Sequence, residues 1–210
     1  MASVPNRRST MSLYVDEKDL DGHSVRLVLK EKDITADIIF VDEGNKPEDL
    51  NILNPYGGVL TLVDRDLVLY QAQIIMEYLD ERYPHPPLMP VDPVSRATNR
   101  QFRYRITRDL FSLSIKAESN EAQVALDAKN QIRDNLEALT PIFEQYAYFM
   151  SEEFSLVDMC LSTILWRLEY WDIKLGSSSK AIYKYADKMF QRETFIASLS
   201  DFEKEMRRIV

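Results

Sequence analysis

The segment PHPPLMPVDP, residues 84–93, divides the sequence into two parts with different patterns. It holds five of the nine prolines in the chain. Proline lacks a backbone N–H and fixes φ, so neither a helix nor a central strand is expected there. We therefore predict a domain at residues 1–83, a proline-rich linker at residues 84–93 and a second domain at residues 94–210.

Short β-type runs alternate with helical patterns ahead of this linker, in the order βαβ-ββα. The expected elements are a strand at 11–15, a helix at 24–32, strands at 37–41, 60–63 and 67–70, and a helix at 71–82. The short spacing between the last two strands suits an antiparallel hairpin. In the last helix, Ile74, Ile75, Tyr78 and Leu79 recur at helical spacing, which predicts a face packed on the sheet.

The part after the linker is rich in helix formers and shows no strand pattern. Its clearest signature is Ser155-Leu156-Val157-Asp158, a capping box in which Ser155 and Asp158 satisfy each other's backbone N–H groups. Apolar residues then recur three or four apart from Leu161 to Leu168, as in a buried central helix. The predicted fold class is therefore α/β plus all-α, with an all-helical C-terminal domain.

The composition excludes several classes of protein. The 210 residues are 45% hydrophobic and carry a formal charge of −8, which suits a soluble globular chain and disfavours direct DNA binding. A single cysteine, Cys160, and two histidines, His23 and His85, predict no internal disulfide and no metal site. No apolar stretch reaches the length of a membrane span, and residues 1–10 lack the apolar region of a secretion signal. We expect a cytoplasmic protein without membrane association.

Several motifs together resemble one branch of a known superfamily. They are NPYGG at 54–58, TLVD at 61–64, IIMEYLDERYPHPPLMP at 74–90, FSLVD at 154–158, LWRL at 165–168 and FIASL at 195–199. With the predicted element order, they resemble the stringent starvation protein A branch of the glutathione S-transferase superfamily. That resemblance implies a thioredoxin-like N-terminal domain followed by the helical domain, over nearly the whole chain.

The resemblance also implies a function. Proteins of this branch are bacterial, dimeric regulators of transcription that bind RNA polymerase holoenzyme, including its sigma factor, and alter promoter use under starvation or stress. By resemblance, Pro84, His85 and Pro86 form the partner-binding site, with Pro87 and Leu88 supporting it. A homodimer is implied, DNA is contacted only indirectly through polymerase, and no cofactor is required.

The sequence also departs from the superfamily pattern for glutathione chemistry. Residues 16–23 contain four carboxylates and no Ser, Thr, Tyr or Cys, so nothing there favours a thiolate. The flanking Tyr14 and Ser24 suit a strand and a first helical turn, respectively. Gln71-Ala72 stands where an acidic residue and a serine would hold the γ-glutamyl group.

The superfamily's Val-Pro motif is replaced by Val59-Leu60. A cis peptide before leucine costs about 3–4 kcal/mol, so the bond is either trans with an altered loop or cis and strained. We therefore predict no catalytic residues. Two alternatives stay open: a glutathione-dependent transferase or peroxidase with a relocated active-site group, and an adaptor subunit of a heterodimer with another partner.

Five arginines, Arg96, Arg100, Arg103, Arg105 and Arg108, lie close together at the start of the helical domain. In an acidic chain, salt bridges within the protein or across a dimer are the favoured interpretation. The alternative is contact with an acidic partner surface, or with DNA phosphate inside a polymerase complex.

Overall fold

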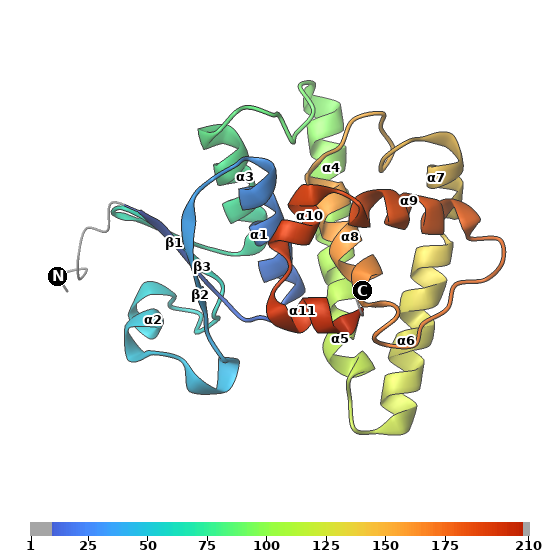
Figure 1. Ribbon diagram of the computed structural model, residues 1–210, viewed down its shortest axis with the longest axis horizontal. Helices are drawn as coiled ribbons and strands as arrows, with labels where there is room; N and C mark the ends of the chain where they lie inside the picture. Colours follow the sequence, from blue (N-terminus) through green and yellow to red (C-terminus); the bar gives the residue numbers. More distant parts are fainter. Residues whose placement is uncertain (1–9, 208–210) are drawn as a thin grey trace.

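The computed structural model describes residues 10–207, so residues 1–9, on which the absence of a secretion signal was argued, lie outside the described part. A small sheet with its helices adjoins a larger helical part, as Figure 1 shows. The predicted fold class is confirmed: a four-stranded mixed sheet precedes a helical C-terminal domain.

The sheet has the order β2-β1-β3-β4. Its strands are β1 (Met11–Val15), β2 (Ala36–Phe40), β3 (Thr61–Asp64) and β4 (Leu67–Tyr70). β2 runs parallel to β1, which requires the helical crossover between them, whereas β3 and β4 form the predicted antiparallel hairpin.

The two faces of the sheet are covered by different helices. α1 (Leu20–Glu31) and α3 (Ala72–Arg82) lie between the sheet and the helical domain, and α2 (Glu48–Leu53) lies on the opposite side (Figure 1). Alternation along the strands explains this, because Leu13 joins the main core while Tyr14 packs with Leu50 of α2. A short 3₁₀ turn, η1 (Glu43–Asn45), precedes α2.

The structure corrects three details of the predicted N-terminal domain. α1 begins at Leu20 rather than at residue 24, because the Asp19 carboxylate accepts hydrogen bonds from the amides of Asp21 and Gly22 and caps the helix there. The short helix α2 was not predicted. In α3 the buried face contains Ile75 and Leu79, whereas Ile74 is 53% exposed and does not pack on the sheet.

The helical domain begins inside the proline segment and wraps around one central helix. Its elements are α4 (Pro93–Arg105), the π-helix η2 (Ile106–Phe111), α5 (Ser112–Ala117), α6 (Ala122–Glu137), α7 (Thr140–Gln145), α8 (Leu156–Arg167), α9 (Lys180–Phe190), α10 (Glu193–Ser198) and α11 (Asp201–Met206). The predicted capping box of Ser155 and Asp158 starts α8, and every residue of this helix is buried. No described helix is long and apolar enough to cross a bilayer.

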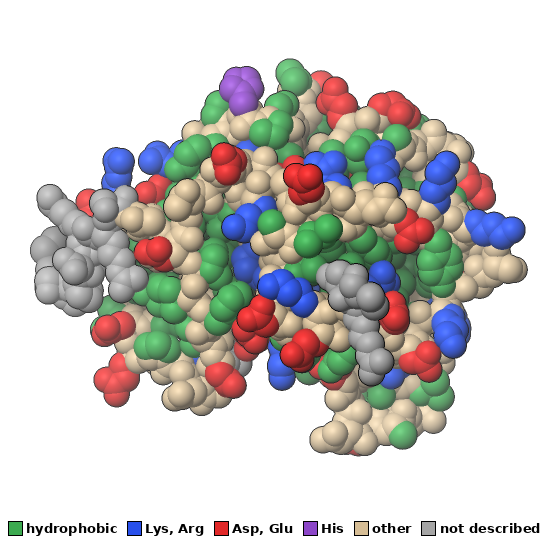
Figure 2. All heavy atoms as spheres, in the orientation of Figure 1, with side chains coloured by type: hydrophobic (Ala, Val, Ile, Leu, Met, Phe, Trp, Pro, Cys, Tyr) green, Lys and Arg blue, Asp and Glu red, His purple; other side chains and the backbone are tan. Residues whose placement is uncertain are grey.

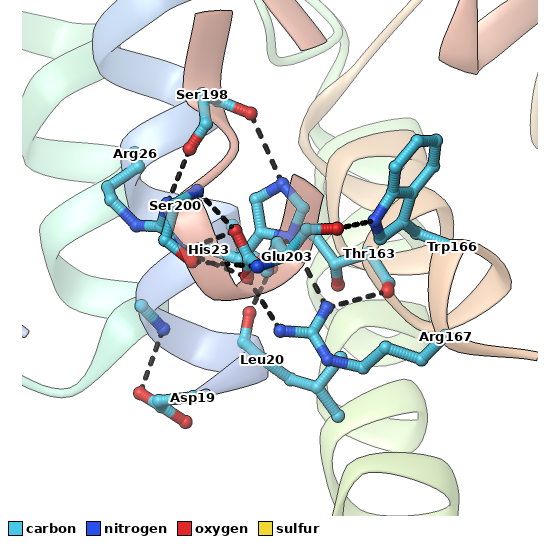
Figure 3. A network of polar contacts seen from close by, with 12 residues as sticks. Asp19, Leu20, His23, Arg26, Thr163, Trp166, Arg167, Ser198, Ser200 and Glu203 are labelled. Carbon is cyan, nitrogen blue, oxygen red and sulfur yellow. Dashed lines mark hydrogen bonds and ion pairs between the residues drawn. The ribbon is translucent and has the colours of Figure 1, made fainter. Parts of the chain in front are cut away.

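A buried charge cluster joins the two domains. Figure 3 shows Glu203 of α11 between His23 and Arg26 of α1 and Arg167 of α8. Its carboxylate oxygens lie 2.9 Å from Arg26 Nη2 and 2.6 Å from Arg167 Nη2, and all four residues are at most 3% exposed. Burial lowers the pKa of His23 to about 4, so this ring is neutral at pH 7 and the two arginines carry the positive charge.

Burial alone would raise the pKa of Glu203, but His23, Arg26 and Arg167 hold it well below its usual value. The carboxylate is therefore charged at neutral pH, where it compensates guanidinium groups from both domains. Two backbone carbonyls add further contacts: Arg26 Nη1 donates to Ser198 O of α10 at 2.5 Å, and Trp166 Nε1 of α8 donates to Glu203 O of α11 at 2.9 Å. α11 thus closes the interface between the sheet domain and α8.

We expect Glu203→Gln to destabilise the protein by about 3–5 kcal/mol, because two buried guanidinium groups lose their compensating charge. The free energy of unfolding from urea titration measures this. Glu205→Gln is the matched control, since Glu205 lies exposed on the same helix, and a change within about 0.5 kcal/mol is expected for it. Equal effects of the two substitutions would contradict a structural role for the cluster.

Candidate functional site

The segment predicted to bind a partner leaves the end of α3 and crosses to the helical domain. Residues 84–87 are exposed, whereas Leu88 is only 2% exposed and belongs to the main core. The structure therefore divides the predicted site: Pro84, His85, Pro86 and Pro87 form a surface ridge, and Leu88 anchors its end. The peptide bond between His85 and Pro86 is cis.

A buried lysine holds the backbone of this ridge. Lys32 follows the end of α1 and its side chain is fully buried. The Nζ atom lies 2.6 Å from Asp80 Oδ1 and also donates to the carbonyl oxygens of Tyr83 at 2.7 Å and Pro86 at 2.5 Å. All three protons of the ammonium group thus have an acceptor. One acceptor, Pro86 O, lies in the ridge, and another, Tyr83 O, lies directly before it.

The far end of the ridge is fixed by two backbone hydrogen bonds. The amide of Leu88 donates to Asp80 Oδ1 at 2.9 Å, and the carbonyl of Leu88 accepts from the amide of Leu156 at 2.9 Å. One bond leads to α3 and the other to the start of α8. The ridge is therefore held by both domains while its proline and imidazole rings face solvent.

A second candidate region is the cleft between the domains, with a volume of about 810 Å³. Its lining comes from the loop at residues 16–21, from residues 58–60 and from η2, α5 and the end of α8. Phe111, Ile115 and Trp171 supply apolar surface on the helical side. On the other side, the loop contributes three carboxylates, Asp16, Asp19 and Asp21, and one cation, Lys18.

The acidic side of the cleft contains a perturbed carboxyl group. Burial, reinforced by the charge of Asp19, raises the pKa of Asp21 to about 7. Its Oδ1 atom is buried without a hydrogen-bond partner. Burial also raises the pKa of Asp19, although the amides of Gly22 and Asp21 oppose this by donating to its carboxylate. This environment disfavours a second negative charge such as a thiolate.

The side chains considered for catalysis lie elsewhere. Tyr14, Ser24 and Cys160 are absent from the described lining of the cleft. Ser24 is buried and its hydroxyl donates to Leu20 O, and burial raises the pKa of Cys160 to about 12. The described residues contain no cis peptide besides His85-Pro86, so Val59-Leu60 is trans, the first of the two predicted possibilities. Among residues 10–207 no group of three His, Cys, Asp or Glu side chains is placed to hold a metal.

The arginine cluster is paired mainly inside the chain, as the favoured interpretation expected. Arg103 is 1% exposed and binds both Gln73 and Glu77 of α3, and Arg100 Nη2 lies 2.7 Å from Glu77 Oε2. Arg96 lies 3.6 Å from Glu81. On the face drawn in Figure 2, acidic and basic side chains are interspersed, which gives no continuous basic surface for nucleic acid there.

Sequence reasoning found the ridge but missed Lys32 and Asp80, which position it. Lys32 lies about fifty residues before both Asp80 and Pro86 in the sequence, and a pair at that distance leaves no periodic signal. The available signal was weak: Lys32 and Asp80 are charged residues at positions that the helical pattern places next to apolar ones.

Comparison with known proteins places these features in a family. Residues 22–82 match the family described as Glutathione S-transferase, N-terminal domain, and residues 103–193 match Glutathione S-transferase, C-terminal domain. A stringent starvation protein A homolog of Pasteurella multocida is 48% identical, covering 95% of this chain and 94% of that protein. The homolog of Histophilus somni is 46% identical, covering 96% and 95%. A rice glutathione S-transferase crystallised with glutathione shares the fold, with a TM-score of 0.84 at 18% identity over 96% of each chain.

We expect Lys32→Met to destabilise the protein by about 3–5 kcal/mol, because Asp80 stays buried without its cation. The ridge loses its anchor in the same variant, so the Leu88 amide should exchange its hydrogen faster. Urea unfolding and amide hydrogen exchange measure the two effects. Lys30→Met is the control, since Lys30 lies exposed on α1. Protection of Leu88 that stays at the wild-type level would contradict the anchoring role.

We expect Asp21→Asn to stabilise the protein by about 1–2 kcal/mol near pH 8, with the gain shrinking toward zero near pH 4. Folding raises the pKa of Asp21 from about 3.8 to about 7. The contribution of Asp21 to the free energy of unfolding is therefore fully present below pH 3.8 and is lost as the pH rises through about 7. Asn removes the buried charge present at high pH. Urea unfolding at both pH values tests this, with the exposed Asp37→Asn as control; a gain independent of pH would contradict the assignment.

Proposed function

This chain belongs to the stringent starvation protein A family of the glutathione S-transferase superfamily, and on that premise we propose that it is a non-catalytic transcription regulator. It binds RNA polymerase holoenzyme, including the sigma factor, and alters promoter use under starvation or stress. Pro84, His85 and Pro86 form the contact surface, with Pro87 and Leu88 supporting it. The observation that carries the proposal is an exposed, doubly anchored ridge in a chain of this family.

The physical properties of the ridge suit protein recognition. Its backbone is held by Lys32 and by the two hydrogen bonds of Leu88, so little conformational entropy remains to be lost on binding. The exposed proline rings offer apolar contact area, and His85 places a hydrogen-bonding imidazole between two of them. A partner can thus bury apolar surface and satisfy one polar group at the same place.

The cleft supports a non-catalytic assignment. Asp16, Asp19 and Asp21 line the side where a thiolate would be stabilised in a transferase. Ala72 lacks the hydroxyl that would hold a glutathione carboxylate. These features favour a regulator over the alternative of a glutathione-dependent transferase or peroxidase.

The proposed assembly is a cytoplasmic homodimer that reaches DNA only through polymerase. Apolar side chains suited to an interface are exposed on α3 and α4: Ile74 is 53%, Val94 75% and Tyr104 56% exposed. A symmetric contact can bury them on both subunits. An adaptor subunit that works only as a heterodimer would lack the homodimer mass in sedimentation.

The combined substitution of Pro84, His85 and Pro86 by alanine should abolish capture of polymerase while leaving the fold intact, because the ridge loses its rings and its imidazole. The measurement is affinity capture of the tagged protein from its host, with mass spectrometry of core polymerase subunits and sigma factor. Circular dichroism and urea unfolding report whether the fold is kept.

Pro93→Ala serves as the matched control, since Pro93 is exposed at the other end of the same linker. Capture by the wild type and by this control, but not by the triple variant, is the expected result. Capture by all three would place the contact elsewhere on the protein. Polymerase missing from the wild-type eluate would refute the proposed function itself.

A further inference from the structure

A groove of about 610 Å³ adjoins the ridge. It runs between the linker at residues 87–92, one face of α4 and the loop that leads into α8. Its lining includes Pro87, Leu88, Val91, Asp92, Phe102 and Glu153. Pro87 and Leu88 therefore belong to both the ridge and the groove.

The apolar wall of the groove is held by contacts within the fold. Phe102 and Phe149 meet edge to face, with their ring centroids 4.9 Å apart. The amide of Phe149 donates to the buried Asp158 carboxylate at 2.8 Å, which ties this wall to the capping box of α8. Val91 and Met150 add exposed apolar surface, at 95% and 45% exposure. Such a preformed pocket suits one bulky apolar side chain.

The ionisable side chains that line the groove are acidic, and the arginines Arg96 and Arg192 contact the lining residues Pro90 and Phe154. Asp92 and Glu153 are its ionisable residues, and none of the described lining residues is Lys, Arg or His. Asp92 also caps α4, because its carboxylate accepts from the Ser95 amide at 2.9 Å, and this bond together with that from the Ser95 hydroxyl lowers its pKa. Asp92 and Glu153 therefore give the groove an acidic edge that can attract a cation.

From the apolar pocket, its acidic edge and its continuity with the ridge, we propose that the groove binds a segment of RNA polymerase holoenzyme that presents a bulky apolar side chain flanked by Lys or Arg. This inference rests on the proposed function and names the chemistry of the partner at that site. The ridge then contacts one side of the segment while the groove holds its anchor. Nucleic acid is disfavoured because carboxylates line the groove, and the contact proposed for the homodimer uses Ile74, Val94 and Tyr104, which are not among the described lining residues.

The first test fills the groove. Thr98→Trp places an indole into it from α4, whereas Ala97→Trp adds the same side chain at the preceding, exposed residue, which does not line the groove. Affinity for polymerase holoenzyme purified from the host is measured by biolayer interferometry. We expect binding about tenfold or more weaker for Thr98→Trp, and within about twofold of wild type for Ala97→Trp.

The second test reverses one charge without filling space. Glu153→Lys changes the groove, while Glu152→Lys makes the same change at the neighbouring exposed carboxylate outside its described lining. We expect Glu153→Lys to weaken binding about three- to fivefold in low salt, with most of the difference lost near 0.5 M salt. Unfolding in urea identifies any variant that fails to fold.

The outcomes separate this inference from the function on which it rests. Wild-type affinity of both Thr98→Trp and Glu153→Lys, with loss in the ridge variant, overturns the groove proposal and leaves the proposed function standing. Stronger binding by Glu153→Lys shows an acidic or nucleic-acid partner and also overturns it. A Thr98→Trp protein that changes its sedimenting mass but not its polymerase affinity shows a second copy in the groove. No polymerase binding by the wild type overturns the proposed function and the groove proposal together.

Discussion

The structure depends on one buried carboxylate. The carboxylate of Glu203 in α11 pairs with Arg26 of α1 in one domain and with Arg167 of α8 in the other. Each guanidinium would be costly to bury alone, and the carboxylate would be costly without them, so the three groups are stable together in one arrangement of the helices. Apolar packing between α1 and α8 tolerates small shifts, whereas bonds of 2.6 to 2.9 Å do not. The cluster therefore fixes how the sheet domain meets the helical domain.

α1 also positions a second buried charge, the ammonium group of Lys32. His23 and Arg26 face α8 and α11, and Lys32, just beyond the end of α1, faces α3 and the proline segment. Because α1 is fixed by the Glu203 cluster, the position of Lys32 is fixed too, and with it the carbonyls of Tyr83 and Pro86. The geometry of the exposed ridge is thus set by contacts that run through the interior of the protein to the last described helix.

Local patterns predicted much of this fold. The sequence pattern predicted strand β1, and in the structure Met11, Leu13 and Val15 of this strand are buried. The capping box predicted the start of α8. The missed elements gave weaker local signals: α2 has only six residues, and the cap of α1 lies in a loop with several aspartates, any of which could begin a helix. Ile74 satisfies the helical period yet faces solvent, since periodicity does not show which neighbouring helices are present. The ridge was predicted from its residues and a resemblance, but its anchor joins residues 32 and 80, for which a single sequence carries no pairing signal.

The architecture also favours the proposed recognition at the linker over recognition in the cleft. In the cleft, Asp19 and Asp21 are partly desolvated, and another anion there would add repulsion to a site that already disfavours its own charge. At the linker, the buried polar groups already have partners within the fold. Lys32 is neutralised by Asp80, and the carbonyls of Tyr83 and Pro86 accept hydrogen bonds from Lys32. The amide and the carbonyl of Leu88 are both hydrogen-bonded. A partner that docks there needs to desolvate mainly proline rings and the apolar walls beside them. The proposed contact therefore requires little reorganisation of the anchored backbone of this protein.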